Sequence, residues 1–151
     1  MQTLKQRHYT DIIKKIDTLQ GAIYQVSKDK TTYIIKVTNK ELHNRHITHW
    51  NGRTVQIQEN VLKEADILRY LTSNNPPKSL VQYINLFEDE CNYFFVMQYG
   101  GDMSLFEFVK KCHQYIVRKI IDINVWHQFC KIAMKQMTDL LDWLHNTMEL
   151  S

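Results

Sequence analysis

The first half of the chain reads mainly as β-strands, because short apolar runs alternate with polar turns, and the second half reads mainly as helices. A polar turn at residues 28–31 divides one apolar region and predicts a β-hairpin over residues 22–37. Two further apolar runs, at residues 80–87 and 93–97, flank an acidic turn and predict a second pair of strands. The aromatic residues at positions 93–95 are expected to lie in a core.

Three segments instead repeat apolar residues every three or four positions, which is the spacing of an amphipathic helix. We expect helices over residues 58–71, 104–112 and 124–146. Consecutive prolines at residues 76–77 follow the first helix and prevent it from continuing, and the glycines at residues 100–101 are expected to form a hinge. Two hairpins with one helix between them, followed by helices only, predict the α+β fold class.

A polar stretch at residues 39–56 is rich in histidine and is expected to be an inserted loop. His43, His46 and His49 lie three positions apart, a spacing that raises the question of a metal site. A structural zinc site usually needs four ligands, and no cysteine lies near these histidines. We therefore predict solvated histidines and assign no metal ligands.

Composition and charge narrow the class of protein. The length of 151 residues and the apolar fraction of 44% suit a globular protein, and a net charge of +3 without clustered basic residues does not indicate nucleic acid as a partner. Cys91, Cys112 and Cys130 are widely spaced, which fits reduced, structural cysteines in an intracellular protein. The sequence shows no signal peptide and no run of the roughly 20 apolar residues that a membrane span requires. A soluble, cytoplasmic protein without a membrane partner is expected.

Lys36 is the strongest candidate for chemistry, because it lies within the apolar strand predicted at residues 33–37. A lysine among inward-facing apolar residues is costly to bury unless an anion meets it. Glu64, on the helix that follows, is one candidate partner, and a bound phosphate is another. The alternative is an edge-strand lysine with its ammonium group in water, beside a glutamate that pairs with helix neighbours.

In the order of its elements the chain resembles a protein kinase over roughly residues 9–151. Lys36 stands in the place of the lysine on the family's third strand, and Glu64 in the place of the glutamate on helix C. Residues 96–99 (Val-Met-Gln-Tyr) resemble the start of the hinge, and residues 143–146 (Trp-Leu-His-Asn) resemble the end of helix E. None of these motifs is specific alone, and the resemblance depends on their order.

The resemblance implies a kinase-like N-lobe over residues 1–98, built from an antiparallel sheet and helix C, with the inserted loop at about 39–56. The hinge and the first helices of a C-lobe, helices D and E, would occupy residues 99–151.

The resemblance also implies an ATP site. Lys36 would orient the α and β phosphates and Glu64 would hold Lys36, so these two are the candidate catalytic residues. The carbonyl of Gln98 and the amide of Gly100 would bind adenine beside Met97, the gatekeeper. The candidate nucleotide-binding residues are Gly21, Ile23, Ile34, Met97, Gln98, Gly100, Asp102 and Ser104. Either of the last two would contact the ribose.

The chain also departs from the family. Of the three glycines that usually cover the phosphates, only Gly21 remains, with Ile16 and Thr18 in the other two places. The glycine-poor loop is similar to that of divergent kinases of the FIKK type. Ile34 replaces the usual alanine above the adenine ring and would narrow the slot for it. The His-Arg-Asp and Asp-Phe-Gly motifs of the family are not found in the 151 residues. Mg²⁺ binding would therefore need residues of a C-lobe that this sequence does not contain.

Two function classes follow. The first is a fragment of a serine/threonine-type protein kinase that transfers the γ-phosphate of ATP to a protein when the C-lobe is present, with an unidentified protein substrate. The chain alone would then be inactive. The alternative is a pseudokinase-like, non-catalytic interaction module, which the weak glycine loop and Ile34 favour. In either case, apolar helix faces left uncovered would lead to self-association.

Overall fold

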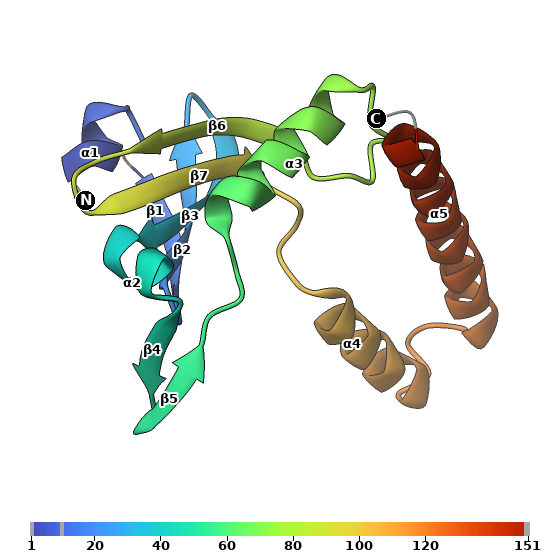
Figure 1. Ribbon diagram of the computed structural model, residues 1–151. Coiled ribbons are helices and arrows are strands. Elements are labelled where there is room, and N and C mark those ends of the chain that lie inside the picture. The colour runs from blue at the N-terminus through green and yellow to red at the C-terminus, as the bar shows by residue number, and fades with distance from the viewer. Residues whose placement is uncertain (1, 10, 150–151) are drawn as a thin grey trace. The chain divides into compact units, whose positions relative to one another are not determined.

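The computed structural model describes residues 2–9 and 11–149 (Figure 1). Contacts divide the chain into two compact units. The first, which we call the sheet unit, comprises Met1–Asn75 and Val81–Tyr99. The second, the helical unit, comprises Pro76–Leu80 and Gly100–Ser151. Together they have an α+β composition, as the order of apolar patterns predicted.

The sheet unit is built around an antiparallel sheet of five strands, which lie in the order β1-β2-β3-β7-β6. The strands are β1 (Asp11–Thr18), β2 (Gly21–Lys28), β3 (Thr31–Asn39), β6 (Tyr83–Glu88) and β7 (Asn92–Gln98). Both predicted hairpins are confirmed, because β2 pairs with β3 and β6 pairs with β7. The strand expected to begin at residue 80 begins instead at Tyr83, and residues 76–80, which include the two prolines, belong to the helical unit.

Helices cover both faces of the sheet. On one face, a short helix that the sequence did not predict, α1 (Gln2–Gln6), contributes Leu4 to a buried cluster with Ile35 and Phe94. On the other face, α3 (Val61–Ser73) lies along β6 and β7 and packs against Phe95 (Figure 1). Phe94 and Phe95 are neighbours on β7, so their side chains point to opposite faces and both are buried. The expected core position of the aromatic run is therefore confirmed.

The expected inserted loop at 39–56 is wrong, because most of it is regular structure. It contains α2 (Lys40–Arg45) and a separate two-stranded ribbon of β4 (Ile47–Trp50) and β5 (Arg53–Gln56), seen in Figure 1. The Asn39 side chain caps α2 by accepting a hydrogen bond from the Leu42 amide at 3.1 Å.

The ribbon has a two-residue turn at Asn51 and Gly52, both with positive φ. Asn-Gly is a preferred pair for such hairpin turns, so this turn was visible in the sequence.

The expectation of solvated histidines is wrong for His43, which is buried and lies edge-on to the ring of Tyr93. His46 and His49 are exposed, as expected. Burial of His43 lowers the pKa of its imidazole below 6.5, and the neighbouring His46 lowers it further. Among the described residues, no three His, Cys, Asp or Glu side chains are grouped so that they could hold a metal ion.

The helix expected at 58–71 is present as α3, but it begins at Val61, because Asn60 caps it. The Asn60 side chain accepts a hydrogen bond from the Lys63 amide at 3.0 Å while the Asn60 backbone stays extended. The residues immediately before the cap, which the apolar spacing had assigned to the helix, form an extended segment instead.

The helical unit contains α4 (Leu105–Val117) and α5 (Ile123–Glu149). Ser104 and Glu107 form a capping box at the start of α4, which continues past the expected end at Cys112. The rings of Phe108 on α4 and Phe129 on α5 pack against each other, with their centroids 4.7 Å apart. Asp139 and Asp142 are exposed on α5. No helix in the described part of the chain is both long and apolar enough to cross a membrane.

Candidate functional site

Lys36 lies on β3, which is paired on both sides, by β2 and by β7. The alternative of an edge-strand lysine is therefore wrong. Only 15% of its side chain is exposed, and its Nζ atom lies 2.7 Å from Oε2 of Glu64 on α3. The expected ion pair is thus confirmed. It joins a central strand to the helix that covers the same face.

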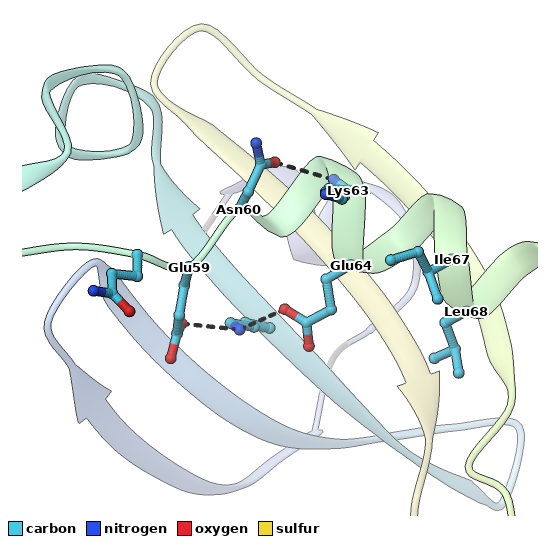
Figure 2. Close-up of a pocket in the computed structure, with 8 residues that line it drawn as sticks. Glu59, Asn60, Lys63, Glu64, Ile67 and Leu68 are labelled. Atoms are coloured by element: carbon cyan, nitrogen blue, oxygen red, sulfur yellow. Dashed lines mark hydrogen bonds and ion pairs between the residues drawn. The ribbon is translucent and has the colours of Figure 1, made fainter.

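A second carboxylate, which the sequence did not indicate, also binds the amine. Oε2 of Glu59 lies 3.1 Å from the Lys36 Nζ atom. Figure 2 shows Glu59 and Glu64 with dashed contacts that reach the same nitrogen atom from two sides. The pattern of residues carried no signal for this contact, because Glu59 lies in the extended segment before the cap of α3, where helical spacing does not apply.

The two carboxylates keep Lys36 charged. Burial alone lowers the pKa of this lysine, but the hydrogen bonds to Glu64 and Glu59 outweigh the burial and raise the pKa above 10.5. The ammonium group therefore persists at neutral pH. Two carboxylates already pair with this ammonium group, so an anionic ligand group would have to compete with one of them for it.

Two cavities meet at this cluster. The first, of about 580 Å³, lies beside α3 (Figure 2) and is lined by Lys36, Gln58, Glu59, Asn60, Lys63, Glu64, Ile67 and Leu68. The second, of about 670 Å³, is lined by Asp17, Thr18, Leu19, Gln20, Ile23, Lys36, Val55, Gln56, Ile57, Gln58 and Glu59. Strand β5 of the ribbon thus supplies part of a cavity wall through Val55 and Gln56, in a segment that was expected to be only a loop.

The sheet register brings several other candidate residues to the face of Lys36. Ile23 lies opposite Lys36 on β2, and Ile34, two positions before Lys36, lies opposite Met97 on β7. Directly opposed residues share a face of a sheet, as do residues two positions apart. Ile23 also lines the second cavity. Met97 instead packs against the apolar cluster that contains Phe95 and the first turns of α3.

The packing of the sheet by itself requires glycine at position 21. Gly21 pairs with Thr38 at the start of β2, and a side chain on its Cα would overlap with the main-chain carbonyl of Val37. Close contact between two strands therefore requires glycine here, whether or not a phosphate lies nearby.

The hinge candidates are divided between the two units. Gln98 is the last residue of β7, and its backbone N–H donates a hydrogen bond to the backbone carbonyl of Gln82 at 2.9 Å. Gly100, Asp102 and Ser104 belong to the helical unit. The Ser104 hydroxyl accepts a hydrogen bond from the Glu107 amide at 3.2 Å, so it already has a role as the cap of α4.

Comparison with known proteins does not assign this chain to a family. No family model matches it, and a search of curated proteins finds no match.

Proposed function

We propose that this chain is the ATP-binding, amino-terminal part of a serine/threonine-type protein kinase. The observation that supports this most directly is the 2.7 Å ion pair between Lys36 and Glu64, which links a central strand of the sheet to α3. The same pairing of a strand lysine with a helix glutamate positions the nucleotide phosphates in protein kinases.

Each residue has a role in this proposal. Lys36 binds the α and β phosphates of ATP, and Glu64 holds the lysine in place. The adenine ring lies against the apolar side chains of Ile23 and Ile34, whose face of the sheet is the face of Lys36. The larger side chain of Ile34, in place of the family's alanine, leaves a narrower slot for the base.

Phosphoryl transfer needs more than this chain supplies. The reaction depends on metal ions that neutralise the developing charge and on a residue that accepts the proton of the attacking hydroxyl. The His-Arg-Asp and Asp-Phe-Gly motifs that provide these groups are not in the 151 residues. In the part of the chain that the structure describes, no three His, Cys, Asp or Glu side chains are grouped to hold a metal ion, so the proposal assigns these residues nucleotide binding and not the chemical step.

A non-catalytic, pseudokinase-like interaction module is the second candidate. The weak glycine loop and Ile34 favour it, because only Gly21 remains of the three glycines and its place in the sheet requires glycine even without a phosphate. The two candidates differ in whether the catalytic motifs follow this part of the chain. A coding sequence that continues past Ser151 into His-x-Asp and Asp-Phe-Gly supports the enzyme, and a continuation without these motifs supports the interaction module.

Nucleotide binding is tested by thermal unfolding of the chain with and without millimolar ATP. We expect ATP to stabilise the wild type, by about 2.7 kcal/mol when ATP is present at about 100 times its dissociation constant. Lys36→Met should abolish the increase in melting temperature, because it removes the charge that binds the phosphates.

Lys40→Met is the matched control. Lys40 is also a partly buried lysine, 25% exposed, and it pairs with Glu88 at 2.8 Å, but it lines neither cavity at Lys36. This variant should keep the ATP-dependent shift. A wild type whose melting temperature does not respond to ATP would contradict the proposal.

A further inference from the structure

Glu59 binds Lys36 from the side opposite to Glu64. The two carboxylates lie 3.1 Å and 2.7 Å from the Nζ atom, and Figure 2 shows both contacts. Because Lys36 has one formal positive charge and the two glutamates have one formal negative charge each, the formal charge of the three side chains together is negative. An approaching anion therefore meets an amine whose charge is already more than balanced.

Glu59 also occupies the place where the two cavities meet. Lys36 and Glu59 line both of them. Glu64, in contrast, lines only the cavity beside α3. On the side of the second cavity, Glu59 is therefore the carboxylate that stands at the amine.

The side chain of Glu59 can leave without disturbing the fold. It is 67% exposed, and an ion pair made by such a side chain contributes little to stability. Its backbone is held independently, because Nε2 of the buried Gln20 donates a hydrogen bond to the Glu59 carbonyl at 3.1 Å. Rotation of the side chain into solvent would expose the amine and leave the cavity wall in place.

From these contacts we infer that Glu59 is an internal competitor for the anionic group of the ligand. It holds Lys36 in the free chain on the side of the second cavity and must rotate away before a nucleotide phosphate binds the amine from that side. Glu64 stays in contact with the amine in both states. This inference rests on the proposed function, since it assigns the regulation of the same nucleotide site.

The test measures ATP binding by isothermal titration calorimetry in buffer without magnesium. Glu59→Gln keeps the size of the side chain and removes its charge. We expect it to tighten ATP binding by about tenfold, since one negative charge within a few ångströms of the phosphate is lost from a partly screened site. Circular dichroism of the variant checks that the fold is unchanged.

Asp66→Asn is the matched control. Asp66 is an exposed carboxylate on the same helix as Glu64, and it pairs with Arg69 at 2.9 Å, not with Lys36. This variant loses the same charge but should change the dissociation constant for ATP by no more than about twofold. Equal gains in Glu59→Gln and Asp66→Asn would overturn the inference, because the effect would then come from net charge alone.

The remaining outcomes separate this inference from the proposed function. If the wild type and Glu59→Gln bind ATP equally well, Glu59 does not compete and the nucleotide site survives. If Glu59→Gln binds ATP more weakly, Glu59 is part of the site and the inference is wrong. If neither protein binds ATP at millimolar concentration, both the inference and the proposed function fail.

Discussion

At the scale of single residues, burial cost made Lys36 conspicuous in the sequence. A lysine in an apolar strand must find an anion, and Glu64 on the following helix was one candidate partner, in the place of the helix C glutamate of protein kinases. The second partner, Glu59, could not be predicted. Its contact depends on the path of an extended segment, which is determined by the cap at Asn60 and by the Gln20 hydrogen bond.

Asp89 shows a second charged group whose contacts determine its ionisation. The carboxylate accepts hydrogen bonds from the Thr3 hydroxyl at 2.8 Å and from the amides of Cys91 and Asn92 at 2.9 Å and 2.8 Å. Burial alone raises the pKa of Asp89, but these hydrogen bonds outweigh it and lower the pKa below 3.8. The Thr3 bond also ties α1 to the turn between β6 and β7.

This lowered pKa makes a pH-dependent prediction. A carboxylate whose pKa is depressed in the folded state contributes stability above its unfolded pKa, and the contribution is lost as the pH falls through the folded value. Asp89→Asn should therefore reduce the free energy of unfolding by about 1 kcal/mol at neutral pH, and the difference from the wild type should vanish in acid.

Denaturant titrations at neutral pH and below pH 3.8 measure the effect of Asp89→Asn. Glu90→Gln is the control, because Glu90 is an exposed carboxylate in the same turn. A difference between Asp89→Asn and the wild type that is the same at both pH values would show that the charge of Asp89 is not involved.

At the scale of elements, local signals located the hairpins and helices and failed at their boundaries. The apolar spacing of α3 ran on towards residue 58, but the Asn60 side chain ends the extended segment and starts the helix. The segment at 39–56 was misread because its polar composition resembles a loop. Its caps and turn residues, Asn39 and Asn51-Gly52, were the better guide.

The cap of α3 carries the next prediction. Asn60→Ala removes the acceptor of the 3.0 Å hydrogen bond from the Lys63 amide, and should lower the free energy of unfolding by about 1 kcal/mol. Asn60→Ser keeps a capping oxygen and should cost much less. Hydrogen exchange at the Lys63 amide, in the first turn of α3, should accelerate in the alanine variant alone. Equal exchange rates in both variants would show that the side chain of Asn60 does not cap the helix.

At the scale of the whole chain, the two units differ in how they bury apolar side chains. The sheet unit has two buried clusters, one on each face of the sheet. In the helical unit, several large apolar side chains on α4 and α5 are more than half exposed, namely Leu105, Phe106, Val117, Val125, Ile132, Met134 and Leu141. Exposed apolar surface of this kind favours association.

Self-association is therefore expected of the isolated chain. Analytical ultracentrifugation over a range of concentrations should show a mass that increases with concentration. Phe106→Glu should shift the association to higher concentration, because Phe106 is 77% exposed on α4. Ile13→Glu, at an exposed position on the edge strand β1, is the control and should leave the concentration dependence of the mass unchanged. A mass that stays monomeric at every concentration would contradict this expectation.

The sequence by itself determined the α+β class, both hairpins of the main sheet and the three long helices, and it marked Lys36 as a charge that needs an anionic partner. These depend on periodicity, turn residues and the cost of an unpaired buried charge, all of which can be read locally. Only the tertiary structure placed β3 inside the sheet, α1 on its second face and Glu59 beside Lys36. Each of these depends on contacts between segments far apart in the chain, which no local pattern specifies.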